Sequence, residues 1–448
     1  MALEVTSGSA PRRPGMAVLQ VLAVCCVAVA VWVYVSRLLV FPPWHHTFDL
    51  RVYRGAVQWW LDGRPLYDFV RPHTSKGFTY PPFGALALMP LAIGTEITAT
   101  VLSTVGSAVL LIGTTWLLVA PVARRHGWTP WFAVALSVPL VFAMEPVRET
   151  FGWGQVNLWV MALVLADVVA LQRGSAWAGV GMGLAAAIKV TPGLFLVYLV
   201  LTRRWRNVAV AVGTFLAATL LALALDPRSS VQFWTDTLWQ TGRVGRVDRT
   251  SNQSLLGLLA RLADPLTPDR RVWLVLAAAV LALALWRAVR AFRRGDELVG
   301  VTITGLATCL ISPISWTHHL YWVVPAAVVL VDVAAGTPVH ASGRPWLRAH
   351  PRAVARGAGV AALAVVAAFF LSVIWFFEHP PGAHDSGGVL GILGENAYVV
   401  ILVALVALLP ARAAGGPAVA TQRGGTFRSA NDSAISTCRM VSSMTSEP

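Results

Sequence analysis

Long apolar runs separated by short polar segments follow one another along most of the chain. The runs are long enough to cross the ~30 Å hydrocarbon core of a membrane as helices, which takes roughly 20 residues each. Membrane-spanning strands would instead show alternating segments of about ten residues, and the sequence lacks them. The pattern therefore predicts an all-α polytopic membrane protein with about twelve transmembrane helices.

The arginines lie mainly in the short segments between the apolar runs. Short loops rich in positive charge remain in the cytoplasm, which orients the chain in the plasma membrane. We therefore expect a multi-pass protein with both termini in the cytoplasm. The longer polar segments then lie on the outer face, at residues 41–82, 226–271 and 378–395.

The order of the runs predicts one membrane domain over residues 16–410. A short cytoplasmic segment, 1–15, precedes it. Residues 411–448 follow it and are rich in Gly, Ser and Thr, so we expect a disordered cytoplasmic tail. The first run, 16–40, is too long for a cleaved signal and is interpreted as a retained anchor.

Composition excludes an ordinary soluble domain, because 56% of the 448 residues are hydrophobic and only 12% are charged. The formal net charge is +14, but the arginines flank the apolar runs, so we expect no nucleic-acid partner. The four cysteines have neither the spacing of a disulfide framework nor that of a zinc site.

The first long loop contains one helical pattern. Residues 49–61 place apolar side chains at helical spacing, with Arg51, Arg54 and Gln58 on the other side. This pattern predicts an amphipathic helix that lies on the outer face.

Two short apolar halves, 176–188 and 193–201, meet at a polar break that contains Lys189. Arginines flank the pair on both sides, so the halves are predicted to form a hairpin within the membrane. Broken helices at that depth are tolerated only where they line a polar cavity. Lys189 is therefore a candidate functional residue.

Asp49 begins the amphipathic helix, between Phe48 and Leu50. A carboxylate beside apolar groups at the mouth of a membrane domain is suited to act as a general base. Aspartate is also a preferred N-cap residue, and position alone favours that interpretation. The two roles are compatible.

Two histidine pairs, His45–His46 and His318–His319, lie at predicted outer ends of spans. Imidazoles there can orient a phosphate or a hydroxyl, or can simply bind backbone groups where a helix begins. Adjacent side chains on a helix point about 100° apart, so a pair offers one easy metal ligand. We expect no metal.

Gln155 and Asn157 enter an apolar run directly after the predicted outer turn 145–154, which contains Trp153. Amide side chains suit sugar hydroxyls, and an indole suits the face of a sugar ring. Hydrogen bonding between helices is the alternative interpretation of the two amides.

Six motifs together resemble glycosyltransferase family 87. In chain order they are FDLRVYR, TYPPFGALAL, GQVNLWV, AAIKVTPGLF, NQSLLG and SPISWTHHLYW. The resemblance covers roughly residues 49–325. It implies a GT-C membrane fold whose active site lies on the outer face, and an activity as a polyprenyl-phosphate-mannose-dependent α-1,2-mannosyltransferase.

By this resemblance the donor would be polyprenyl-phosphate mannose. The acceptor would be a mannosylated glycolipid, either a phosphatidylinositol mannoside or lipomannan and lipoarabinomannan. Asp49 matches the acidic residue of the first outer loop and would be the catalytic base of an inverting transfer. His318 or His319 would lie beside the donor phosphate. No cofactor is implied.

The other candidates would bind the donor phosphate or the sugars. Arg51, Arg54 or Lys189 would neutralise the departing phosphate. The remaining candidates lie within or beside the motifs and are expected to contact substrate: Tyr80, Gln155, Asn157, Asn252 and Gln253.

Two rival functions fit the same pattern. A GT-C arabinosyltransferase would use a polyprenyl-phosphate pentose in place of the mannose donor. A lipid or sugar transporter (a flippase) would bind its substrate at the broken hairpin, but the polar residues gather at the outer mouth and no internal repeat is visible. We therefore expect an enzyme whose partners are lipid-linked sugars and membrane lipids.

Overall fold

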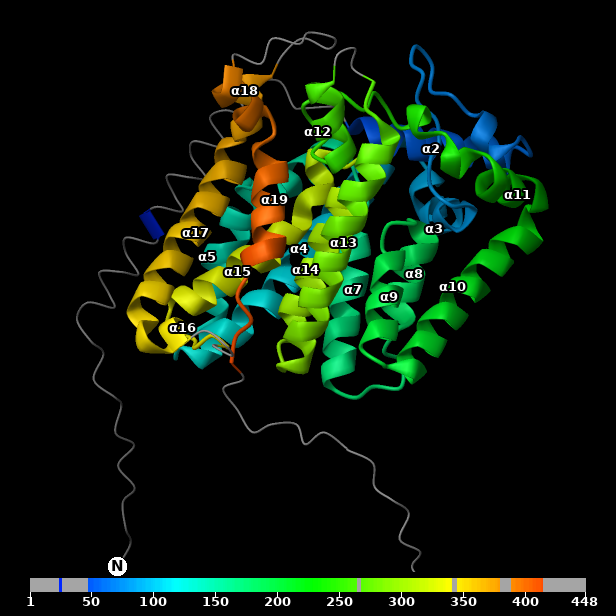
Figure 1. The fold of residues 1–448 in the computed structure, drawn as a ribbon. Helices are drawn as coiled ribbons and strands as arrows, with labels where there is room; N and C mark the ends of the chain where they lie inside the picture. Colours follow the sequence, from blue (N-terminus) through cyan, green and yellow to red (C-terminus); the bar gives the residue numbers. More distant parts are fainter. Residues whose placement is uncertain (1–23, 26–46, 264–266, 341–344, 379–387, 414–448) are drawn as a thin grey trace, which may run out of the picture. The chain divides into compact units, whose positions relative to one another are not determined.

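The computed structural model describes residues 24–25, 47–263, 267–340, 345–378 and 388–413, which form a bundle of helices (Figure 1). Several predictions fall outside these residues. They concern the segment 1–15, the anchor 16–40 apart from two residues, His45, His46 and the tail beyond residue 413.

Five helices of the described residues are long and apolar enough to cross a membrane. They are α4 (Glu96–Arg125), α10 (Trp205–Leu225), α13 (Arg270–Arg293), the stretch Thr317–Ala334 and α17 (Pro351–Leu371). Two bent pairs raise the number to as many as seven: α5 (Pro130–Ala143) with α6 (Glu145–Trp153), and α18 (Gly388–Glu395) with α19 (Ala397–Leu408). The chain is therefore a multi-pass membrane protein.

Shorter apolar helices fill the space between the long ones. They are α3 (Pro82–Ala92), α7 (Asn157–Gln172), α8 (Val180–Ile188), α9 (Gly193–Leu201) and α14 (Glu297–Ile311), while α15 (Val323–Ala334) is the main part of the long stretch Thr317–Ala334. The predicted break between α8 and α9 is confirmed, because Lys189 has the extended backbone angles φ −147° and ψ 128°. Helix α14 is buried from residue 299 to residue 310.

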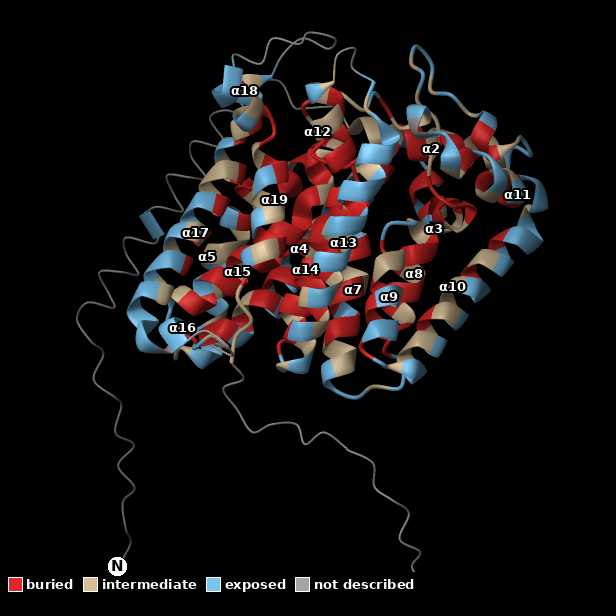
Figure 2. Ribbon diagram, viewed as in Figure 1, coloured by how far each residue is buried: buried red, intermediate tan, exposed pale blue. Residues whose placement is uncertain are grey.

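Burial separates a central group of helices from a peripheral one (Figure 2). Only 11% of the apolar window of α13 is buried, against 17% for α10, 22% for α17 and 78% for Thr317–Ala334. Apolar side chains such as Leu220, Val275 and Leu363 remain exposed on the peripheral helices. In a bilayer these faces contact lipid, which is as apolar as they are.

The two ends of the bundle differ in character (Figure 1). Helices α2 (Phe48–Leu61), α11 (Pro227–Thr235), α12 (Leu255–Leu262) and α18 gather at one end, here called the loop end. The connections between α7 and α8 and between α9 and α10 lie at the opposite end, here called the arginine end, where the arginine-rich short loops lie. The described parts of the three predicted outer segments therefore share one end.

Two local predictions are corrected by the structure. Helix α2 begins at Phe48, and its cap position is Thr47, with φ 51° and ψ 42°, so the N-cap interpretation of Asp49 is wrong. Asp49 instead lies in the first turn, where the partial positive charge of the helix N-terminus favours a carboxylate. The predicted outer turn 145–154 is the helix α6, bent 68° from α5.

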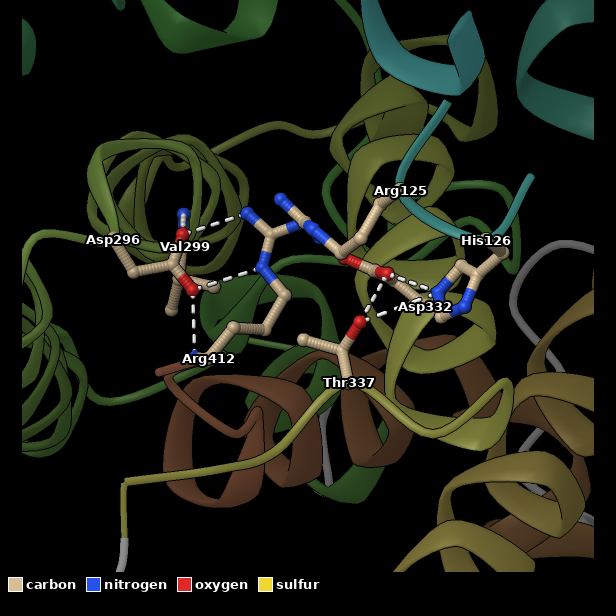
Figure 3. A network of polar contacts seen from close by, with 7 residues as sticks. All are labelled: Arg125, His126, Asp296, Val299, Asp332, Thr337 and Arg412. Carbon is tan, nitrogen blue, oxygen red and sulfur yellow. Dashed lines mark hydrogen bonds and ion pairs between the residues drawn. The ribbon is translucent and has the colours of Figure 1, made fainter. Parts of the chain in front are cut away.

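A charged cluster closes the arginine end (Figure 3). Arg412 donates to both carboxylate oxygens of Asp296, from Nε at 2.9 Å and from Nη2 at 2.7 Å. It also donates from Nη1 to Oδ2 of Asp332 at 2.9 Å. The fully buried carboxylate of Asp332 is contacted as well by Arg125, His126 and Thr337.

This cluster fixes the chain beyond the last helix. The backbone pairs Val339 with Arg412, and His340 N–H donates to the carbonyl oxygen of Ala411 at 2.9 Å. The packed part therefore continues through Ala413, three residues into the segment predicted as a tail.

We predict that Arg412→Ala lowers the free energy of unfolding by about 3 kcal/mol, because it leaves the buried Asp296 carboxylate without its bidentate partner. The measurement is the thermal unfolding midpoint of the protein in detergent micelles. Arg246→Ala, which removes an exposed arginine from a single ion pair with Asp248, is the control and should lower the midpoint much less. Equal midpoints for the two variants would contradict the prediction.

Candidate functional site

A cavity of about 1030 Å³ lies at the loop end. Its walls come from α2, the loop before α3, α6 and the α6–α7 junction, and the α8–α9 break. Further wall residues lie within 233–261 and 308–319, together with Trp375, Glu378 and Glu395. A volume of this size suits a sugar together with part of a lipid. The cavity brings together six of the predicted site residues: Asp49, Tyr80, Gln155, Lys189, His318 and His319.

A chain of hydrogen bonds ends at Asp49. Gln155 donates from Nε2 to Oδ2 of Asp49 at 2.5 Å, and the Tyr80 hydroxyl donates to Oε1 of Gln155 at 3.0 Å. The hydroxyl oxygens of Tyr53 and Tyr80 are 2.8 Å apart. The side chains of Tyr53, Tyr80 and Gln155 are buried. The chain therefore ties α2, the loop before α3 and the α6–α7 junction to one carboxylate.

A glycine allows this junction to approach α2. Gly154 ends α6 with φ 66° and ψ 45°, a left-handed conformation that side chains disfavour. A Cβ atom at this position would also lie 2.6 Å from Cβ of Leu50. Because glycine removes both obstacles, Gln155 reaches the carboxylate of Asp49.

Lys189 lies at the break between α8 and α9. Its Nζ donates to Oδ1 of Asn157 at 2.7 Å, lies 3.1 Å from Nε2 of His319 and lies 5.3 Å from the centroid of the Tyr80 ring. The ammonium group of Lys189 attracts an anion, and the imidazole of His319 beside it can hydrogen-bond one, so the pair suits a phosphate group.

His318 lies next to an aromatic surface. Its ring centroid is 6.2 Å from that of Trp153 and 4.7 Å from that of His319. Trp153 also contacts Phe48 edge to face at 5.9 Å and donates from Nε1 to Glu149 at 2.9 Å. The indole therefore lies between the helix that carries Asp49 and the histidine pair, where it can face a sugar ring.

Sequence reasoning missed several cations that line the cavity, among them Lys76, Arg243 and Arg249. Lys76 donates from Nζ to the Val244 carbonyl oxygen at 3.0 Å. Burial, followed by the charge of Arg249, lowers the pKa of Lys76, whereas Asp49 acts in the opposite direction. The available signal was that Lys76 is one of only two lysines in the sequence.

Arg51 and Arg54 do not line the cavity. Arg51 pairs with Glu96, with Nε 2.7 Å from Oε1, and Arg54 donates to the Gly94 carbonyl oxygen at 2.6 Å. Arg51 therefore binds the first residue of α4 and Arg54 binds the α3–α4 connection, on the other face of α2 from Asp49 and Tyr53. The expectation that they neutralise a phosphate is therefore corrected.

Asn252 and Gln253 are fully buried and do not line the cavity either. Gln253 donates from Nε2 to the carbonyl oxygens of Thr250 and Glu395 and accepts from the Val399 N–H. Asn252 likewise binds backbone groups of residues 247, 313 and 315. The amide groups of both side chains hydrogen-bond backbone groups of the protein. The two residues therefore hold loops together at the loop end and do not contact substrate.

Asn157 occupies an intermediate position. It does not line the large cavity, but it lines an adjoining pocket of about 50 Å³ together with Lys189 and His319. In the ranges that the structure describes, no three His, Cys, Asp or Glu side chains group closely enough to hold a metal ion. The site thus combines the Asp49 carboxylate, a lysine–histidine pair and an indole, which suits base catalysis beside an anionic group.

Comparison with known proteins agrees with this chemistry. Residues 78–313 match the family model described as glycosyltransferase family 87. No solved structure matches the chain.

Three relatives illustrate the range of the similarity. A protein of Mycolicibacterium smegmatis named polyprenol-phosphate-mannose-dependent alpha-(1-2)-phosphatidylinositol mannoside mannosyltransferase is 35% identical over 74% of this chain and 80% of its own length. A second protein of that organism, named as the corresponding phosphatidylinositol pentamannoside mannosyltransferase, is 30% identical over 84% and 87%. An alpha-(1->3)-arabinofuranosyltransferase of Mycobacterium tuberculosis is 28% identical over 56% and 57%.

We predict that Gln253→Leu lowers the free energy of unfolding by about 3 kcal/mol, because it leaves three buried backbone groups without their partner. The measurement is again the thermal midpoint in detergent. Gln240→Leu is the control, since the Gln240 side chain is exposed and binds only Asp236 in the described residues. A Gln253→Leu protein as stable as the control would contradict the structural role.

Proposed function

This chain belongs to glycosyltransferase family 87, and we propose that it transfers mannose from polyprenyl-phosphate mannose to a phosphatidylinositol mannoside, forming an α-1,2 linkage. The names of the relatives that are at least 30% identical support this donor and this class of acceptor. The observation that carries the proposal is the cavity in which Asp49 shares walls with Lys189 and the histidine pair.

Asp49 is the proposed general base of an inverting transfer. As the acceptor hydroxyl oxygen bonds to the anomeric carbon, the bond from that carbon to the phosphate oxygen breaks, and its electron pair leaves with the phosphate. The hydroxyl proton passes to Asp49. Attack on the face opposite a β-linked phosphate produces the α linkage.

Lys189 and His319 are the proposed partners of the leaving phosphate. Negative charge develops on the phosphate oxygen as the bond breaks, and the fixed ammonium group of Lys189, with the His319 imidazole beside it, stabilises that charge. The hydrogen bond from Lys189 to Asn157 holds the ammonium group in place before substrate binds. Trp153, beside His318, offers the surface on which a mannose ring stacks.

A pentose donor is the nearest rival, because an arabinofuranosyltransferase is among the relatives. That similarity is lower in identity and covers less of the chain than the similarity to the mannosyltransferases. Assays with polyprenyl-phosphate arabinose in place of the mannose donor decide between the two, and we expect product only from mannose.

Asp49→Asn should lower the rate of mannosyl transfer at least about 100-fold, because the amide cannot accept the acceptor proton. The assay uses purified protein, polyprenyl-phosphate mannose and phosphatidylinositol mannosides, with products identified by mass spectrometry. Asp62→Asn, at the exposed C-terminal end of the same helix, should retain activity. Undiminished transfer by Asp49→Asn would refute the base, and absence of product from the wild-type protein with every mannosylated acceptor would refute the function.

The proposed topology places the loop end on the outer face. A GT-C type membrane domain over residues 16–410, with about twelve crossings, would have its active site on this face and both termini in the cytoplasm. The short arginine-rich loops at the opposite end of the bundle support this orientation.

Two single cysteines test this topology in a protein whose four native cysteines are replaced. Ser75→Cys is exposed in the first outer loop, and Ala176→Cys is exposed between α7 and α8 at the arginine end. A membrane-impermeant maleimide should label Ser75→Cys in intact cells and Ala176→Cys only after the membrane is opened. The reverse pattern would invert the proposed orientation.

A further inference from the structure

When the carboxylate of Asp49 is ionised, only one assignment of donors and acceptors satisfies the hydrogen bonds that lead to it. Oε1 of Gln155 can only accept, so Tyr80 must donate its single hydroxyl proton to it. The oxygen of Tyr80 is then the acceptor toward Tyr53. If the Gln155 amide were turned over, its oxygen would lie 2.5 Å from Oδ2 of Asp49, and neither oxygen could donate a proton to the other.

The two tyrosines keep the protons that this order requires. Burial, as the largest cause, raises the pKa of both Tyr53 and Tyr80 above the usual tyrosine value. Their rings pack together with centroids 5.3 Å apart. The hydroxyl of Tyr67 donates to the backbone carbonyl oxygen of Tyr80 at 2.7 Å and takes no part in this chain of side-chain hydrogen bonds.

We propose that Tyr80 and Gln155, with Tyr53 behind them, are positioning residues that hold Asp49 ionised and in one orientation for the transfer reaction. This inference rests on the proposed function, in which Asp49 is the base. It assigns to Tyr80 and Gln155 a role different from the substrate contact expected from the sequence, and it adds Tyr53, which the sequence did not single out.

The chain positions the base but does not carry its proton. The Gln155 amide separates the tyrosine hydroxyls from Asp49, and an amide N–H does not pass a proton along as a hydroxyl does. The proton that Asp49 takes from the acceptor therefore leaves through the cavity. The other charged groups that act on Asp49 include Arg71, Lys76 and Lys189, and the variants below leave them unchanged.

The decisive variant is Tyr80→Phe, which keeps the ring beneath Lys189 and removes only the hydroxyl. Without that donor the Gln155 amide is free to turn, and Asp49 loses a hydrogen bond that favours its ionised form. We expect kcat to fall about tenfold or more, the KM for the donor to stay unchanged, and the acidic limb of the pH profile of kcat/KM to move to higher pH.

The matched control is Tyr67→Phe. It also removes one buried tyrosine hydroxyl from a hydrogen bond near the site, but that hydroxyl binds the backbone and lies outside the chain. We expect a comparable fall in the thermal midpoint without movement of the acidic limb. Tyr53→Phe, one bond further from Asp49, should move the limb in the same direction as Tyr80→Phe but by less.

Assays of Asp49→Asn beside these variants separate the two hypotheses. If Asp49→Asn is inactive but Tyr80→Phe and Tyr67→Phe have equal kcat and an unmoved acidic limb, the positioning role is overturned while the base remains. If Asp49→Asn keeps the wild-type rate, the base and the positioning role are both overturned. If Tyr80→Phe is too unstable to assay, Tyr53→Phe is tested in its place. An unmoved acidic limb of its pH profile would then overturn the positioning role.

Discussion

A charge inside an apolar bundle must have a partner, and this requirement decides how the helices of this protein meet at both ends. At the arginine end, Arg412 connects Asp296 to Asp332 and so joins the start of α14, the end of α15 and the chain beyond α19. At the loop end, Gln155 joins α2 to the α6–α7 junction through Asp49. One cluster is closed by protein groups, whereas the other faces a cavity.

The cavity exists because several helices stop short of crossing the bundle. Helices α8 and α9 meet at Lys189, and α6 ends at Gly154, so polar backbone and side chains appear where continuous helices would have packed. Non-helical backbone at this depth is stable where it lines a polar space. Tyr80 contacts both the residues that lead to Asp49 and the proposed phosphate-binding lysine, because its hydroxyl donates to Gln155 and its ring lies beneath Lys189.

Most of the fold followed from the order of apolar and polar residues. Helix α2, helices α8 and α9, and the break between them at Lys189 were predicted to within a few residues, because helical periodicity and chain-breaking residues act locally. Helix α6 was predicted as a turn, because a short polar helix at a bend shows no helical period of apolar residues. The position of Thr47 as the cap of α2 depends on backbone angles that sequence does not specify.

The sequence by itself determined the chemistry available at the site: Asp49 in the first loop, Lys189 at a break and the two histidines before a span. Only the tertiary structure decided which candidates meet. Arg51 turns to Glu96 and Gln253 to backbone groups, while Tyr53 joins the site from the apolar face of α2. The physical reason is that hydrogen-bond partners far apart in the sequence are selected by packing, and a linear pattern records which groups need partners but not which partners they find.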